Sequence, residues 1–239
     1  MKPNHISRIC PLLYVLAFLI LTVPSCSSVT DVSQQPTSVV TLQPAIGILV
    51  TFVPDTSEGV TEEAMVTARD VLVKRLELAD IKGAKATLVD SFTIQVELTQ
   101  ASDIPTTVQL GTTEGRLIFF GSSSSFSAGE LAPSNPDIIL SNEDISGAQL
   151  LQQGEQIQIG IDLTATGGSK LAEFTKTHIG EYLVVACDGK VIMSPQIPTE
   201  IRDTHIIISG SFTLESGKLL VIQLGSGRLP FKLNAVNHP

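Results

Sequence analysis

The sequence predicts an α+β fold made of two ferredoxin-like subdomains, a head inserted into a base. Two patterns favour this fold. Short β-rich runs alternate with amphipathic helical segments in both halves of the chain, and the first half has the order strand, helix, strand, strand, helix, strand of a split βαβ unit. A chain of 239 residues can bury such a core, and a charged fraction of 16% is too low for a disordered or coiled-coil protein.

The first 25 residues predict an export signal rather than folded structure. Lys2 and Arg8 precede an almost wholly apolar run at 12–23, which is shorter than the roughly 20 residues that span a bilayer. Cys26 follows the small residue Ser25, as in bacterial lipoprotein signals. We therefore expect Cys26 to carry acyl chains such as palmitate and to anchor the protein to the outer face of the cell membrane. An ordinary secretory signal cleaved nearby, or a short retained anchor, is the alternative.

Charge and cysteine content narrow the function classes. The net charge of −9 leaves no basic surface for a phosphate backbone, so nucleic acid is excluded as an expected partner. Of the three cysteines, Cys10 lies in the signal and Cys26 is the expected lipid site, which leaves only Cys187. We expect no disulfide, and we expect Cys187 to be a buried small hydrophobic residue rather than a reactive thiol.

The base begins after a flexible tether at 26–44, and its first part is expected at 45–121. Thr61, followed by Glu62 and Glu63, predicts the start of a helix. The apolar face of that helix is expected to consist of Ala64, Ala68, Val71, Leu72, Leu76 and Ala79. Strands are expected at 46–53, 85–89, 92–98 and 115–120, and a weaker helix at 101–110.

The head is expected at 122–212, with a Ser- and Pro-containing surface loop at 121–136 where it joins the base. Its strands are expected at 156–163, 182–187, 190–193 and 206–209, with a helix that begins at Thr166 and ends at Gly180. Asp188-Gly189 is the signature of a two-residue type I′ hairpin, and we expect both residues to be structural. Segment 213–239 returns to the base as a helix at 214–224 and a strand at 231–236.

No catalytic, metal or cofactor site is expected. Ser122 to Ser125 lack the strand-turn-helix setting of a nucleophile elbow, and the spacing of His178 and His205 fits no zinc pattern. The glycine-containing stretch at 160–168 matches no nucleotide-binding spacing, so a tight turn with a helix cap is the better interpretation. A hydrolase using the serines or His178 is the least favoured function.

The residues around the hairpin resemble the first extracytoplasmic domain of SecD, a subunit of the bacterial Sec protein-export machinery. The resemblance rests on Phe174, Thr175 or Thr177, Asp188, Gly189, Ser194, Pro195, Gly210 and Phe212, and on Leu219, Leu220, Leu224, Gly225, Gly227, Leu229 and Pro230. Segments 68–76 and 113–119 resemble its base. Arg228 and Asp203 depart from the pattern, and the transmembrane helices of SecD have no counterpart in this sequence.

The resemblance implies a non-catalytic module that assists protein export, with unfolded preproteins or Sec translocase components as partners and a head that tips relative to its base. Ile157, Ile159 and Ile161, or the outer face of 206–208, are candidates for lining a peptide groove, but burial in the core is the favoured interpretation of these residues. The alternative is a stand-alone structural or ligand-binding lipoprotein that kept the fold without an export role.

Overall fold

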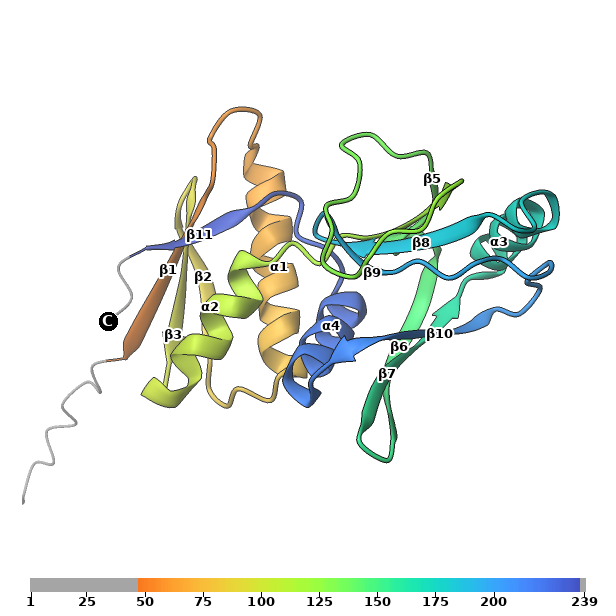
Figure 1. Cartoon of the computed structure of the whole chain (residues 1–239). Coiled ribbons are helices and arrows are strands. Elements are labelled where there is room, and N and C mark those ends of the chain that lie inside the picture. Colours follow the sequence, from red (N-terminus) through yellow and green to blue (C-terminus); the bar gives the residue numbers. More distant parts are fainter. Residues whose placement is uncertain (1–46, 237–239) are drawn as a thin grey trace, which may run out of the picture. The chain divides into compact units, whose positions relative to one another are not determined.

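The computed structural model describes residues 47–236, which belong to one compact unit starting at Pro44. Its first sheet is antiparallel, with the strand order β11-β1-β3-β2. The strands are β1 (Ile48–Pro54), β2 (Lys85–Asp90), β3 (Thr93–Leu98) and β11 (Leu233–Val236). Helices α1 (Glu62–Leu78) and α2 (Ile104–Thr112) lie against one face of this sheet, and a single 3-10 turn (Ala101–Asp103) precedes α2 (Figure 1). The predicted return of the last strand to the first sheet is thus observed.

Helix α1 begins where the sequence predicts, because the Thr61 side chain accepts a hydrogen bond of 3.2 Å from the Ala64 amide. Its buried face differs from the predicted one. Ala64, Val71 and Ala79 are only partly buried, whereas Met65 and Arg75 are fully buried beside Ala68, Leu72 and Leu76. The face is therefore turned slightly toward Met65, and it packs with Val50, Phe52, Ile94 and Val96 of the sheet into the base core.

Strand β4 (Leu117–Ser122) is not part of the first sheet, where the sequence order placed it. It pairs instead with β5 (Ile138–Ser141) and β8 (Tyr182–Cys187). The physical reason is that β4 is apolar on both faces, so both must be covered. Leu117 and Phe119 join one buried cluster, and Ile118 and Phe120 join another.

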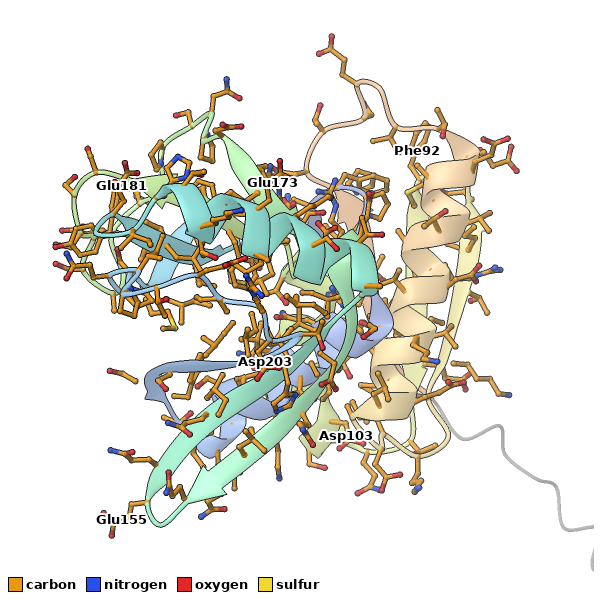
Figure 2. The ribbon with its side chains drawn as sticks, turned by 90° about the vertical axis from the view of Figure 1, so that its right-hand side faces the viewer. Phe92, Asp103, Glu155, Glu173, Glu181 and Asp203 are labelled. Atoms are coloured by element: carbon orange, nitrogen blue, oxygen red, sulfur yellow. The ribbon has the colours of Figure 1, made fainter. Side chains whose placement is uncertain are left out.

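The head consists of two antiparallel sheets rather than the single sheet of one ferredoxin-like unit. One has the order β5-β4-β8-β9 and the other the order β10-β7-β6. The further strands are β6 (Ile145–Gln153), β7 (Gln156–Leu163), β9 (Lys190–Met193) and β10 (His205–Phe212). The sequence did not predict β5 or β6, because their polar and glycine residues hide the period of two. A 3-10 turn (Asn142–Asp144) joins them, and the β6–β7 hairpin extends to a tip at Glu155 (Figure 2).

Helix α3 (Ala165–Thr177) packs on the head, and its N-cap lies two residues earlier than expected. Its N-cap is Thr164, whose hydroxyl accepts a hydrogen bond of 3.0 Å from the Gly167 amide, and not Thr166. Strand β7 ends at Leu163, so Thr164 is the first residue free to take the extended cap conformation. The stretch at 160–168 is therefore a strand end with a helix cap, as the sequence indicated.

Helix α4 (Leu214–Ser226) contacts both cores. Leu220 is buried in the head cluster with Ile159 and Ile208, while Leu219 and Ile222 pack against the base cluster. The helix therefore lies between the two parts of the molecule. Because α4 packs on both cores, its position does not test the predicted end of the head at residue 212. That boundary stays a prediction.

Candidate functional site

The tip of the β8–β9 hairpin is bonded to the segment that leaves the base. Asp188 and Gly189 have φ angles of 47° and 77°, as a type I′ turn requires. The Asp188 carboxylate accepts hydrogen bonds from the backbone amides of Arg116 (2.7 Å) and Gly115 (3.2 Å), and the Asp188 amide donates to the Arg116 carbonyl (3.0 Å). Asp188 thus holds the segment that runs from the base to the head, residues 113–116, against the head. We call these residues the first crossing segment.

Arg75 of α1 binds both segments that run between base and head. Its guanidinium is fully buried and donates to the carbonyls of Leu110 (2.6 Å), Thr113 (2.5 Å) and Glu114 (2.8 Å). It also donates to the carbonyl of Gly227 and the hydroxyl of Ser226, each at 3.3 Å. The second crossing segment, residues 226–229, pairs with the first through the Leu229 amide and the Glu114 carbonyl, 2.9 Å apart.

Gln223 of α4 and the backbone conformation of Gly115 also hold the first crossing segment. Gly115 has a φ of 74°, and a Cβ atom there would lie 2.9 Å from both Arg75 Nη2 and Gln223 Cβ. The Gln223 amide on α4 donates a hydrogen bond to the Thr113 hydroxyl. Only glycine fits at this position, because the backbone conformation is left-handed and the side chains of α1 and α4 close around it.

Burial changes the pKa values of two groups at this junction. It lowers the pKa of Arg75 to about 10, a shift that the nearby Asp188 carboxylate and Cys187 partly oppose. Burial also raises the pKa of the Cys187 thiol to about 12; Asp188 raises it further and Arg75 opposes the shift. Because the thiolate is the nucleophile, this shift disfavours reaction of Cys187 at neutral pH.

The other residues of the expected head motif lie in the packing of β8, β9 and β10. The Pro195 carbonyl accepts a hydrogen bond of 2.9 Å from the Leu183 amide, and Phe212 packs against the head core. A Cβ on Gly210 would lie 3.2 Å from the Phe212 ring, and the Ser194 hydroxyl is buried with no partner among the described residues. Cys26 lies outside the described residues.

The candidate catalytic groups are not coupled to one another. Ser122, Ser123 and His178 line one pocket of about 200 Å³, yet the Ser122 hydroxyl donates to the Ser124 carbonyl. His178 Nδ1 is bonded to the Phe174 carbonyl at 2.9 Å, and its ring stacks on Phe174 with 4.0 Å between centroids. His205 is bonded to Asp162. In the described part of the chain, no serine is therefore hydrogen-bonded to a histidine.

The described residues contain neither a membrane-spanning helix nor a cluster of metal ligands. Within 47–236, no helix combines the length and the hydropathy of a membrane span. Nor does this stretch bring three His, Cys, Asp or Glu side chains together in a way that would hold a metal ion.

Sequence reasoning missed Arg75. The signal for it is its spacing, because Arg75 stands three residues after Leu72 and four before Ala79, where the helical period requires a buried side chain. The sequence does not reveal that Arg75 binds the carbonyls of Leu110, Thr113 and Glu114. No local sequence pattern indicates which loop contacts this part of α1.

Known proteins resemble this chain in sequence over the head. Residues 119–231 match the family model described as "SecDF, P1 head subdomain". The protein translocase subunit SecD of Magnetococcus marinus is 39% identical over 97 residues, which are 40% of this chain and 18% of that protein. SecD of Sebaldella termitidis is 38% identical over 96 residues, 40% of this chain and 24% of that protein. The matches thus cover about a quarter or less of these relatives.

Two solved structures share the fold. One, described as a membrane component SecDF that enhances protein export, superposes with a TM-score of 0.69 and 21% identity, covering 80% of this chain and 99% of that chain. The other, SecDF in its super-membrane-facing form, has a TM-score of 0.73 and 20% identity, covering 80% of this chain and 30% of that chain. This chain therefore carries a SecD-like domain, whose residues 119–231 match the P1 head subdomain of SecDF and whose fold is that of the SecDF P1 domain.

Proposed function

We propose that this protein is a non-catalytic extracytoplasmic module that assists protein export by binding unfolded chains at the membrane. The observation that supports this function best is the match of residues 119–231 to the SecDF P1 head. The translocation subunits that resemble it act in export, and Sec translocase components are accordingly the proposed partners. The proposed attachment to the membrane is a lipid on Cys26.

The proposed contact for an unfolded chain is the outer edge of β6. In the sheet order β10-β7-β6, strand β6 pairs with β7 on one side only, within the described residues. An edge strand offers unpaired backbone groups to an extended peptide whatever the sequence of that peptide. The first set of groove candidates is less suitable, because Ile157, Ile159 and Ile161 are buried in the core.

Site-specific crosslinking tests this contact. A photoreactive amino acid at the exposed Gln152 of β6 should crosslink to an arrested secretory preprotein in intact cells. The same amino acid at Glu173, which is also exposed but lies on α3, serves as the matched control (Figure 2). Equal crosslinking from both positions, or none from Gln152, would contradict binding at the β6 edge.

The lipid anchor has a separate test. Cys26→Ser should release the mature protein from the membrane fraction and lower its mass by that of the acyl chains. One acyl chain binds a bilayer only marginally, whereas two or more anchor stably, so the release should be nearly complete. Unchanged fractionation and unchanged mass would contradict the assignment of Cys26.

Deletion of the gene distinguishes the export role from the alternative of a stand-alone ligand-binding lipoprotein. Slower maturation of reporter preproteins, restored by the wild-type gene, is the expected result. Normal export in the deletion strain would favour the alternative.

A further inference from the structure

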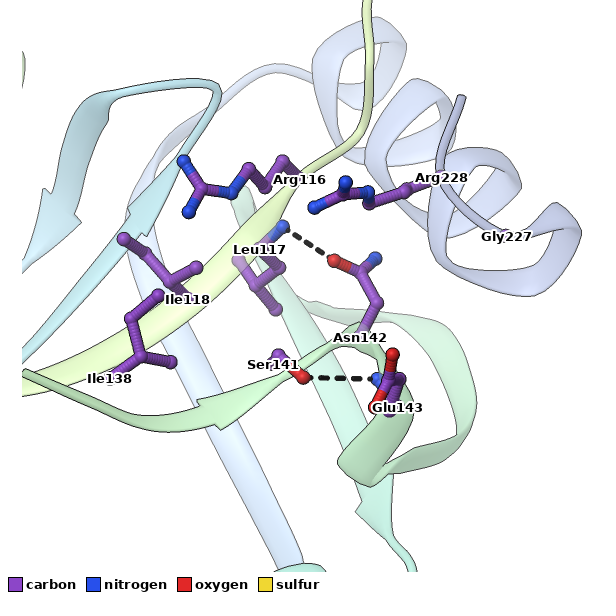
Figure 3. A pocket seen from close by; sticks show the side chains of 9 residues that line it. All are labelled: Arg116, Leu117, Ile118, Ile138, Ser141, Asn142, Glu143, Gly227 and Arg228. Atoms are coloured by element: carbon purple, nitrogen blue, oxygen red, sulfur yellow. Dashed lines mark hydrogen bonds between the residues drawn. The ribbon is translucent and has the colours of Figure 1, made fainter. Parts of the chain in front are cut away.

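A pocket of about 410 Å³ lies where β4 leaves the first crossing segment (Figure 3). Its lining comes from both crossing segments, from β4, and from β5 with the 3-10 turn after it. The lining residues are Arg116, Leu117, Ile118, Ile138, Ser141, Asn142, Glu143, Gly227 and Arg228. The volume is within the roughly 300–1,000 Å³ of small-molecule sites.

Two arginines of this pocket have no charged partner. Neither Arg116 nor Arg228 forms an ion pair or a side-chain hydrogen bond with any residue of 47–236, whereas Arg69 and Arg202 are paired with Asp70 and Glu200. Arg228 extends from the end of α4 toward β4, and the Arg116 side chain lies on the side of Ile118 (Figure 3). In a chain with a net charge of −9, this pocket therefore offers two free guanidinium groups to an anion.

The other lining residues include apolar side chains and one polar side chain, Asn142, that is held by hydrogen bonds. Leu117 and Ile118 are buried, and Ile138 is 40% exposed at the rim. Asn142 is held in place, because its amide oxygen accepts from the Leu117 amide and its nitrogen donates to the Gly115 carbonyl, both at 2.9 Å. Glu143 is the one acidic residue of the lining, and it forms no ion pair with either arginine.

We propose that this pocket binds a carboxylate that is joined to an apolar group. Arg116 and Arg228 bind the carboxylate, and Ile118 and Ile138 contact the apolar group. Two sources supply this chemistry, the C terminus of a peptide with an apolar last residue and a short fatty acid. The inference is independent of the export role, because it depends only on the charges and the shape of this pocket.

Calorimetric titration of the purified mature protein tests the site. The probes are N-acetyl-alanyl-leucine with a free carboxylate, the same dipeptide as its C-terminal amide, and octanoate. At least one of the two carboxylates should bind, and the tighter one identifies the source. The amide should bind at least roughly tenfold more weakly, since a hydrogen bond to a charged group is lost.

Substitutions locate the binding. Arg116→Gln and Arg228→Gln should each weaken the carboxylate roughly tenfold, and Glu143→Gln should strengthen it. Arg202→Gln removes the same charge from an exposed arginine elsewhere on the head and should have no effect. The midpoint of thermal unfolding should stay unchanged in Arg228→Gln, since that side chain has no partner to lose.

Four results would overturn the proposal. The first three are no binding of either carboxylate at millimolar concentration, equal affinity for the carboxylate and the amide, and equal affinity of the wild type and both arginine variants. Competition by inorganic phosphate with no preference for the apolar probes would also overturn it, because a simple anion site needs no apolar wall.

Discussion

At the scale of single residues, two charged side chains at the junction bind backbone groups rather than each other. The Arg75 guanidinium has five N–H donors and meets carbonyls of both crossing segments, while the Asp188 carboxylate meets two amides of the first one. Burying a charge is costly unless its hydrogen-bonding capacity is satisfied. Here the bonds are with the ends of secondary-structure elements, so each charge also determines the path of the chain.

The thiol of Cys187, the last residue of β8, should be almost inert in the folded protein. Since burial raises its pKa to about 12 from the usual 9.0, the thiolate fraction at pH 8 falls roughly a thousandfold. In a Cys10→Ser, Cys26→Ser background, iodoacetamide should therefore alkylate Cys187 at least a hundredfold more slowly in the native protein than in urea. Comparable rates in the two states, followed by mass spectrometry, would show an accessible thiolate.

At the scale of elements, α4 connects the two cores because one of its faces packs on the head and the other on the base. A glycine, Gly217, allows one face to approach β6 and β7 closely, since a Cβ there would lie 2.7 Å from Leu150 and 2.9 Å from Ile157. Leu219 and Ile222 on the other side pack with α1 and the base core. The helix begins with a capping box in which Thr213 and Ser216 bond reciprocally, so its start is fixed as well.

Two glycines of α4 provide a matched pair of substitutions. Gly217→Ala should lower the free energy of unfolding by about 1–2 kcal/mol, because overpacking outweighs a gain of about 1 kcal/mol in helix propensity. Gly225→Ala should cause no loss, since its Cβ would meet only Leu78 at an ordinary 3.5 Å. Urea unfolding followed by circular dichroism measures both. A stabilised Gly217→Ala variant would contradict the close contact of α4 with the β6–β7 sheet.

At the scale of the whole molecule, the head is connected to the base by two chain crossings that share one buried side chain. Arg75 binds both crossings, Gln223 binds the first, and the Leu229 amide pairs the second with the first. A motion of the head would therefore have to break or carry along this set of bonds. The two parts should consequently unfold together.

Replacing Arg75 tests this coupling. Arg75→Met keeps an apolar stem in the base core but leaves the carbonyls of Leu110, Thr113 and Glu114 unpaired, at a cost of about 1–3 kcal/mol each. We expect a loss of at least about 3 kcal/mol, and scanning calorimetry should show two transitions in place of one. Arg69→Met on the same helix is the control, because Arg69 is paired only with its neighbour Asp70. A single transition with a loss no larger than in the control would refute the coupling.

Local patterns in the sequence were enough to predict many elements. The start of α1 at Thr61, the bounds of β7, β8 and β9, and the positive φ values of the Asp188–Gly189 turn agree with the structure. Each depends on a short-range rule, such as a cap, an alternation of apolar residues or a turn dipeptide. The resemblance to the SecD head, which rests on the same segment, is confirmed by the match of residues 119–231.

Tertiary structure alone decided that β4 joins the head and what the charged residues do. The order of the elements predicted that the last strand returns to the base sheet, but only the packing of apolar groups on both faces of Leu117–Ser122 assigns that strand to the head. The bonds of Arg75 join residues separated in sequence by 35 to 152 positions. No local pattern encodes such pairings, because they depend on how buried surfaces and unpaired backbone groups meet once the whole chain has folded.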